Sequence, residues 1–498
     1  MKITVNGELN KYYVQMLCMI FFPGVKFSDA EEDGLSVSVD IDKTETGVMT
    51  KAVLNFDEKT AEAIATEDFS PDVSEERSVK IAVGAAILSA GGDLLGYRPS
   101  WGMLTGVRPS KVAMELLQAG YSKTRVKKLL NQKYSVIPKK ASLATDVALC
   151  ETAIIGKPSP RDCSVYIAVP FCPSRCAYCS FVSYTSKKLL SLIPEYLVRL
   201  GEEIDSIFAQ IKSLGLNVKT VYIGGGTPTV LEADQLRYLL SKVNENWDVS
   251  TLEEFTLESG RPDTITAEKM AVAAEYGVTR VCINPQTLSD EVLRGIGRNH
   301  SGSDFFAAYD IARNSGIKYI NTDLIAGLPG DNFKSFSATV DKIISMRPDN
   351  ITVHTFCVKK ASDFLRRNCN VYSLRGGDAG KCVDYSQIRT AIAGYKPYYM
   401  YRQKNTVGNL ENVGFALEGA EGRYNIYMME EVHSIFAAGA GAVSKLVKYP
   451  QAEGEKSVIK RIFNKKYPYE YLADKGRDEI AKQTDEFYRE YVKITEND

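Results

Sequence analysis

Hydrophobic and polar positions follow different rhythms in different parts of the chain. Two stretches among the first 55 residues, 3–5 and 35–41, alternate with a period of two, which is typical of half-buried strands. From about 75 to 151 the pattern is helical, with an apolar run over 79–88 and shorter segments at 110–117 and 122–130. A proline-containing stretch, 157–162, follows. The pattern predicts an α+β N-terminal domain over 1–158.

The middle of the chain alternates strand patterns with helical patterns. The strand patterns lie at 165–169, 220–223, 255–258, 279–283, 318–323 and 350–356, and an amphipathic helix is expected over 194–214. Such alternation predicts parallel strands joined by right-handed crossovers. Because six units are fewer than the eight of a closed barrel, we expect a partial (β/α)6 TIM-like barrel over 159–375. Its active site should lie at the carboxyl ends of the strands.

The remaining residues, 376–498, predict a mixed C-terminal domain. They contain an aromatic stretch at 395–401, a run of small residues at 437–442 and a charged helical pattern at the end. We expect this domain to cover the substrate.

Composition narrows the class of protein. Lys and Arg number 61 against 62 Asp and Glu, so a basic surplus of the kind that binds nucleic acid is missing. No apolar run approaches the length of a membrane span and no secretory leader is evident, so we expect a cytoplasmic protein without a membrane partner. The chain has three histidines in all, so a zinc site with three histidine ligands would need every one of them and is not expected.

Three of the ten cysteines stand close together in the loop after the first barrel strand. Cys172, Cys176 and Cys179 have the spacing C-x3-C-x2-C, and no fourth cysteine or histidine is near. Three thiolates on a four-iron cluster leave one iron open for a small ligand. A zinc site completed by a distant ligand is the alternative.

This loop resembles that of radical S-adenosylmethionine (SAM) enzymes. Further stretches, 166–172, 224–229 and 323–330, are similar to the oxygen-independent coproporphyrinogen III oxidase family. Segments 101–109, 401–405, 408–414 and 439–445 are similar to its HemZ-type branch, the coproporphyrinogen dehydrogenases. One departure is that Ser180 and Phe181 follow the triplet where the best-studied oxidase branch has a fourth cysteine.

The resemblance implies a radical SAM oxidoreductase of anaerobic heme and porphyrin biosynthesis. Its cofactors would be a [4Fe-4S] cluster held by the three cysteines and one SAM, or two. Its reaction would be oxidative decarboxylation of coproporphyrinogen III to protoporphyrinogen IX, with the electron supplied by a donor such as a flavodoxin or ferredoxin.

The resemblance also implies a set of SAM-contacting residues. By matching of motifs, these are Tyr166, Tyr178, Gly225, Gly226, Thr227, Glu258, Gln286, Arg298, Asp323, Cys357 and Val443. Arg402, Lys404 and Asn405 stand among tyrosines. They form either an ordinary tyrosine-rich interface or a contact for the propionates of a tetrapyrrole. His354 is expected to be a hydrogen-bonded structural histidine at a strand end. If it has a functional role, it would donate a hydrogen bond to a carboxylate.

Two further functions stay open from the residues alone. One is a heme-binding chaperone of the same family, without turnover. The other is a radical SAM enzyme that acts on a different tetrapyrrole.

Overall fold

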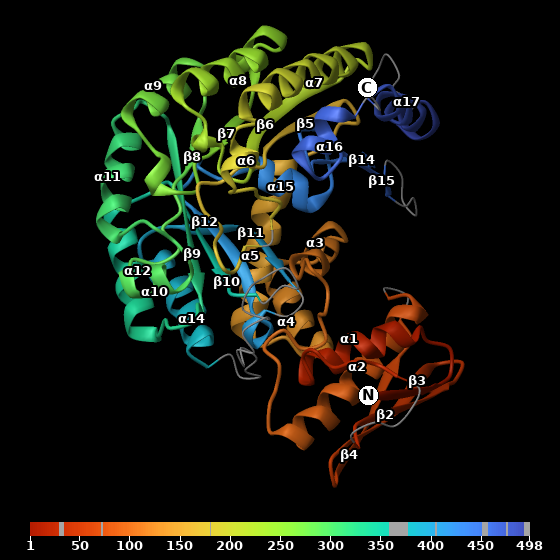
Figure 1. Ribbon diagram of the computed structural model, residues 1–498. Helices are drawn as coiled ribbons and strands as arrows, with labels where there is room; N and C mark the ends of the chain where they lie inside the picture. Colours follow the sequence, from red (N-terminus) through yellow and green to blue (C-terminus); the bar gives the residue numbers. More distant parts are fainter. Residues whose placement is uncertain are drawn as a thin grey trace. The chain divides into compact units, whose positions relative to one another are not determined.

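The computed structural model describes residues 1–28, 34–70, 73–179, 181–357, 377–403, 406–450, 457–474 and 477–492. Contacts divide the chain into two compact units (Figure 1). Unit 1 is Met1–Cys150 with Asn370–Lys381 and Met400–Asn412. Unit 2 is Glu151–Cys369, Cys382–Tyr399 and Val413–Asp498.

Unit 1 is built on a four-stranded sheet in the order β1-β2-β3-β4. Its elements are β1 (Lys2–Asn6), α1 (Lys11–Phe21), β2 (Ser36–Lys43), β3 (Gly47–Phe56), β4 (Lys59–Asp68), α2 (Glu75–Leu95), α3 (Ser110–Gln118), α4 (Lys123–Tyr134) and α5 (Pro138–Ile155), whose end enters unit 2. Strand β1 is parallel to β2, and the other neighbours are antiparallel. The expected α+β character is confirmed, but sequence patterns missed helix α1 and strand β4.

Helix α2 is as long and apolar as a membrane span, which sequence reading had not anticipated. It is one such helix in the part of the chain that the structure describes, and 61% of its most apolar window is buried. It packs on β3 and β4. Burial against a sheet is what the core helix of a globular unit requires, so this composition by itself does not indicate a membrane.

Unit 2 is organised by a large sheet with helices along its outer face (Figure 1). Six consecutive parallel strands form its centre: β5 (Asp162–Val169), β6 (Asn217–Gly225), β7 (Glu254–Glu258), β8 (Arg280–Cys282), β9 (Tyr319–Ala326) and β10 (Asn350–Thr355). The crossovers contain α7 (Ile193–Ser213), α8 (Ala233–Asn246), α9 (Ala267–Glu275), α10 (Asp290–Gly295), α11 (Gly302–Arg313) and α12 (Phe333–Met346). The partial barrel of six units is confirmed.

Strands from the C-terminal part extend this sheet at both edges. They are β11 (Lys396–Arg402), β12 (Glu411–Ala416), β13 (Ser434–Ala438), β14 (Val443–Lys448) and β15 (Val458–Phe463). The order is β11-β12-β10-β9-β8-β7-β6-β5-β13-β14-β15, so the sheet is open. Strand β13 runs parallel to β5, and β12 antiparallel to β10. Sequence patterns did not reveal that the C-terminal part continues the barrel sheet.

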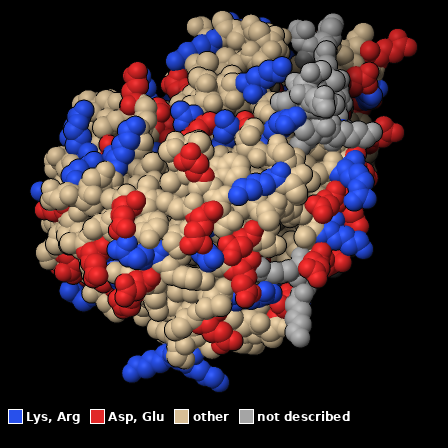
Figure 2. Space-filling model, turned by 90° about the horizontal axis from the view of Figure 1, so that it is seen from above, with Lys and Arg blue, Asp and Glu red and all other residues tan. Residues whose placement is uncertain are grey.

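Further helices of four to sixteen residues lie in the described part. They are α6 (Lys187–Leu190), α14 (Gly377–Ile392), α15 (Arg423–Glu430), α16 (Pro468–Ala473) and α17 (Arg477–Phe487). On the face in Figure 2, basic and acidic side chains are interspersed, in keeping with a formal net charge of −1.

Candidate functional site

The carboxyl ends of the six parallel strands carry the predicted site residues. Because parallel strands end at the same edge, loops far apart in sequence are brought together there. The cysteine loop follows β5, Gly225 ends β6 with Gly226 and Thr227 after it, Glu258 ends β7, Gln286 follows β8 and Cys357 follows β10. Asp323 lies in the middle of β9 rather than at its end, because this strand continues three residues beyond the predicted one.

The cysteine loop is held by backbone hydrogen bonds. Cys172 N–H donates to Tyr184 O at 3.1 Å, and Tyr184 N–H donates to Pro170 O at 2.8 Å. Cys179 N–H donates to Cys176 O at 3.0 Å, which closes a turn. The loop is therefore folded back on its own flank before any ligand is considered.

The three thiols lie within electrostatic range of one another. Burial, above all, raises the pKa of Cys172 to about 11; a hydrogen bond from Thr227 opposes this, and the other two thiols add to it. The Cys172 Sγ and Thr227 Oγ1 atoms are 3.3 Å apart. Thr227 belongs to the glycine motif 224–229, from which it was predicted to contact SAM. In the structure it contacts a cysteine directly.

Arg261 is a contact of this loop that sequence reasoning missed. Its guanidinium is 2% exposed and donates to Ser174 Oγ at 2.8 Å, with Cys176 Sγ at 3.9 Å. Asp263 receives two further hydrogen bonds from it, at 2.9 and 3.0 Å. Arg261 therefore joins the end of β7 to the loop. Its one signal in the sequence was its position, three residues after Glu258, which ends β7.

The glycines that end β6 permit close backbone packing. A Cβ on Gly226 would stand 2.4 Å from Phe171 O, and Gly225 has φ +106°. Gly226 N–H donates to Val169 O at 2.8 Å. The glycine motif thus lets β6 approach the start of the cysteine loop.

Glu258 is the centre of a buried polar network. One carboxylate oxygen accepts from the Tyr222 hydroxyl and the other from Asn284 Nδ2 at 3.0 Å. Burial, followed by the charge of Asp323, raises the pKa of Glu258 to about 7. Near pH 7 this carboxyl group is therefore divided between its neutral and charged forms.

Asp323 extends the network across the next strands. It accepts from Asn321 Nδ2 at 2.8 Å, and His354 Nε2 lies 3.5 Å from its second oxygen. Burial acts to raise the pKa of Asp323, but the hydrogen bond and charge of His354 hold it below its ordinary value. His354 faces a carboxylate, as its sequence position suggested.

Gln286 and Arg298 carry buried polar atoms that have no hydrogen-bond partner among the described residues. Gln286 has φ +68°, and its Oε1 is unpaired, as is Nε of Arg298. The Arg298 guanidinium donates to Asn284 O and, at 3.3 Å, to Gly260 O. Burial acts to lower the pKa of Arg298, but Tyr178 and Cys176 raise it overall. Unpaired buried atoms beside a loop of thiols are a place for a polar ligand.

Three stacked tyrosines line the inner face beside this edge. The rings of Tyr166 on β5, Tyr222 on β6 and Tyr424 on α15 all contact one another, with centroids 6.1 Å apart for Tyr166 and Tyr222, 4.7 Å for Tyr222 and Tyr424, and 6.4 Å for Tyr166 and Tyr424. Burial raises the pKa of both Tyr166 and Tyr178. Tyr166 thus belongs to an aromatic stack that the motif did not reveal.

The remaining predicted residues that the structure describes lie after β10, in β14 and in unit 1. Cys357 is half-buried after β10, and Val443 is half-buried at the start of β14. In unit 1, the Arg402 guanidinium is buried and donates to Leu104 O and Asn409 Oδ1. Lys404 and Asn405 lie outside the described residues.

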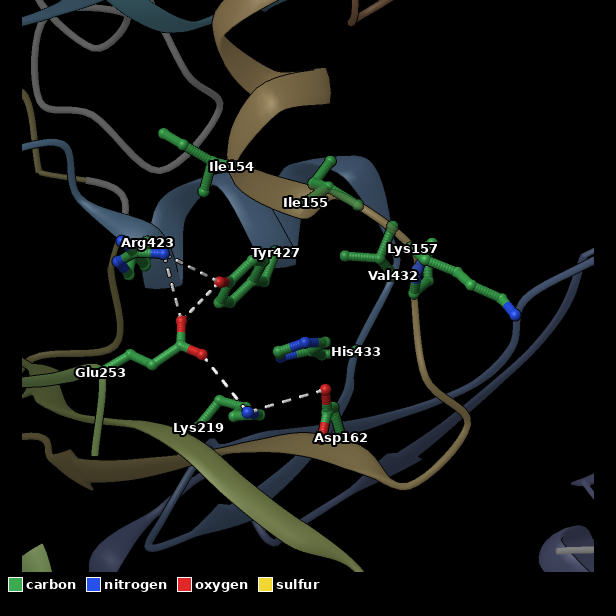
Figure 3. A pocket seen from close by; sticks show the side chains of 11 residues that line it. Ile154, Ile155, Lys157, Asp162, Lys219, Glu253, Arg423, Tyr427, Val432 and His433 are labelled. Carbon is green, nitrogen blue, oxygen red and sulfur yellow. Dashed lines mark hydrogen bonds and ion pairs between the residues drawn. The ribbon is translucent and has the colours of Figure 1, made fainter. Parts of the chain in front are cut away.

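A pocket of about 100 Å³ lies at the opposite, amino-terminal end of the strands (Figure 3). Its charges are paired with each other. Glu253 lies 3.4 Å from Lys219 and 3.3 Å from Arg423, and it accepts from the Tyr427 hydroxyl at 2.6 Å. We therefore place the candidate site at the carboxyl edge.

Comparison with known proteins identifies the family of this chain. Residues 166–343 match the Radical SAM superfamily model. The chain is 37% identical over 389 residues to the oxygen-independent coproporphyrinogen-III oxidase-like protein HemZ of Bacillus subtilis, covering 77% of each chain. The chain belongs to the radical SAM superfamily and to the family of HemZ. The family predicted from the motifs is thereby confirmed, together with the cofactors of the superfamily, a [4Fe-4S] cluster and SAM.

Other relatives of this HemZ-family protein bear names that indicate different functions. The heme chaperone HemW of Bacillus subtilis is 31% identical over 308 residues, covering 61% of this chain and 77% of that one. Among solved structures, coproporphyrinogen III oxidase HemN of Escherichia coli matches with a TM-score of 0.50 at 20% identity, covering 67% of this chain and 73% of that one. The structural match supports the fold.

The residues present fit a four-iron cluster better than a single ion. Within the described ranges, no three His, Cys, Asp or Glu side chains are arranged to hold one metal ion. In a four-iron cluster each thiolate binds a different iron, so the sulfurs stand further apart than around one zinc. Three neighbouring thiols and the unpaired atoms of Gln286 and Arg298 suit that group and a polar ligand on it.

Proposed function

We propose that the chain catalyses the oxidative decarboxylation of coproporphyrinogen III to protoporphyrinogen IX, in the cytoplasm and with an electron from a flavodoxin or ferredoxin. The proposal rests on a structural observation and a sequence similarity taken together. Three closely spaced thiols lie at the carboxyl edge of a partial barrel, in a chain 37% identical to a coproporphyrinogen-III oxidase-like protein.

Cys172, Cys176 and Cys179 would hold the cluster. When bound, the reduced cluster and SAM supply a carbon-centred radical that can remove a hydrogen atom. Arg261 would keep the loop in place through Ser174.

The polar residues of the edge would orient SAM. Glu258 and Asp323 offer carboxylate oxygens, Arg298 offers guanidinium N–H groups, and Gln286 offers an unpaired carbonyl oxygen. The other contacts proposed for SAM are the backbone and hydroxyl at Gly225, Gly226 and Thr227, the rings of Tyr166 and Tyr178, and Cys357 and Val443.

On the substrate, each of the two reacting propionates would lose a hydrogen atom from its β-carbon to the radical. The carbon–carbon bond to the carboxylate then breaks, carbon dioxide leaves, and one electron passes to an external acceptor, which leaves a vinyl group. Burial of the tyrosine stack and of Glu258 would keep water from the radical site.

The test is an anaerobic assay of the reconstituted protein with dithionite, SAM and coproporphyrinogen III, with products read by mass spectrometry. We expect loss of two carbon dioxide molecules per substrate. Cys176→Ala should abolish this loss and reduce bound iron, whereas Cys150→Ala, outside the loop, should leave both unchanged. SAM cleavage with intact coproporphyrinogen III would contradict the proposal.

A heme-chaperone function is the second candidate, because the HemW relative covers 61% of this chain. It predicts stoichiometric heme binding without decarboxylation. A radical SAM reaction on another tetrapyrrole is the third, and the mass of the product separates it from the first.

A further inference from the structure

We propose that an exposed aromatic and basic patch beside the cysteine loop is the docking surface for an acidic one-electron redox protein. The patch consists of Phe181, Tyr184, Tyr467 and Tyr469 with the cations Arg175, Lys465 and Lys466. The proposal deepens the proposed function, because it assumes a reducible cluster in the adjacent loop.

The patch is attached directly to the cysteine loop. Tyr184 pairs through its backbone with Cys172 N–H at 3.1 Å, and Phe181 is two residues after Cys179. The Tyr184 ring lies 5.9 Å from that of Tyr467, and its hydroxyl donates to Lys466 O at 3.1 Å. Two segments almost 300 residues apart therefore form one surface against the loop.

The aromatic side chains of this patch are exposed to an unusual degree. Phe181 is 69% exposed, Tyr469 56% and Tyr467 41%, while the rings of Tyr467 and Tyr469 are stacked 5.7 Å apart. A stacked pair of exposed tyrosines has the composition of an interface rather than of a solvated face. Aromatic residues and arginine are also the residues that most often dominate binding energy.

The charges around these rings are mostly positive. Arg175, Lys465 and Lys466 are exposed, and within the described residues neither lysine forms an ion pair. Glu470 is the acidic residue close enough to act on the Tyr184 hydroxyl. Because the whole chain carries a net charge of −1, this local excess is not a general property of its surface. It favours an acidic partner and would steer its approach.

The position of the patch indicates an electron donor as that partner. The proposed reaction consumes one electron at the cluster for each SAM cleaved, and the patch is joined to the cluster loop by the backbone hydrogen bond between Cys172 N–H and Tyr184 O. Electron-transfer encounters use small interfaces, so a few aromatic anchors with a basic rim are enough.

The experiment compares two electron sources for SAM cleavage by the reconstituted full chain. One source is dithionite, and the other is a reduced acidic flavodoxin at low ionic strength. The variant is Lys465→Glu with Lys466→Glu, and its matched control is Lys212→Glu with Lys334→Glu, two exposed lysines elsewhere on unit 2. We expect the patch variant to cleave SAM about tenfold more slowly with flavodoxin and at an unchanged rate with dithionite.

A second variant, Tyr469→Ala, tests the aromatic part and should slow the flavodoxin reaction without changing its salt dependence. Equal slowing with both donors would overturn the proposal by assigning the patch to the active site or the fold. Unchanged rates with flavodoxin would also overturn it, and a raised KM for coproporphyrinogen III with dithionite would assign the patch to the substrate. Absence of dithionite-driven cleavage by the parent protein would refute the proposed function itself.

Discussion

At the scale of single residues, Glu258 is a carboxyl group whose surroundings favour its protonated form. The Tyr222 hydroxyl and Asn284 donate to it, yet burial and the nearby Asp323 keep its pKa at about 7. A motif can place a glutamate at a strand end, but only the packed neighbours set its charge.

This pKa makes stability depend on pH in a defined direction. A carboxyl group with a pKa raised on folding binds more protons in the folded state, so its contribution is complete below pH 4.5 and is lost as pH rises through about 7. We expect the difference in the free energy of unfolding between the parent and Glu258→Gln to change by roughly 3 kcal/mol across this window. Urea titrations at several pH values measure it; a constant difference would contradict the raised pKa.

Gly226 provides a second test at this scale. A methyl group in Gly226→Ala would stand 2.4 Å from Phe171 O, which is backbone and cannot turn away. We expect a loss of about 1–3 kcal/mol in the free energy of unfolding and reduced iron binding after reconstitution. Gly295→Ala is the control, because a Cβ there meets no atom within 4 Å and should leave stability equal or higher. Similar effects at both positions would show that close packing is not the reason for the glycine.

At the scale of elements, helix α7 holds the small-residue loop at the carboxyl end of β13. Glu203, buried on α7, accepts from Gly439 N–H and from Asn464 Nδ2, both at 2.9 Å, and from the Tyr471 hydroxyl. The Tyr196 hydroxyl donates to Ala168 O and accepts from Ala440 N–H. The loop is thereby fixed to β5, the strand that leads into the cysteines.

Glu203→Gln should disturb this arrangement. The substitution replaces one carboxylate oxygen, an acceptor, with an amide nitrogen, a donor. This buried amide group would then face one of the three groups that donate to Glu203. We expect a loss of about 1–3 kcal/mol in the free energy of unfolding. Its neighbour Glu202, which is exposed, supplies the control: Glu202→Gln should change stability by less than about 0.5 kcal/mol. Equal stability of the two variants in thermal unfolding would exclude the proposed clamp.

At the scale of the whole molecule, unit 1 is completed by a segment from late in the chain. Within that unit, Lys140 on α5 forms a fully buried ion pair with Glu411, which also accepts from the Trp101 indole at 2.8 Å. Burial acts to raise the pKa of Glu411, but Lys140 and Trp101 hold it below its ordinary value. The N-terminal sequence therefore depends on residues 271 positions away for a charge partner.

Lys140→Met tests this dependence. It leaves Glu411 buried without its cation, so we expect the free energy of unfolding to fall by about 3–5 kcal/mol. A change in tryptophan fluorescence should accompany this loss, because Trp101 donates to Glu411. Lys128→Met, an exposed lysine on α4, should change neither. A Lys140→Met protein as stable as its parent would mean that Glu411 is neutral in the folded state.

The sequence by itself determined the features that repeat over short distances. Alternation of apolar strands and helices identified the six-unit partial barrel, because each period is a property of one element. The spacing of Cys172, Cys176 and Cys179 predicted a cluster loop and led to the family, which the comparisons confirm, because ligands on one loop need no tertiary information.

Only the tertiary structure decided the contacts between distant segments. Arg261 beside the cysteines, Tyr222 on Glu258, Glu203 on Gly439 and strand β13 beside β5 are partners with no shared local period. The physical reason is that a buried donor needs an acceptor, but many acceptors in the chain would satisfy it, and the packing of the whole sheet selects one.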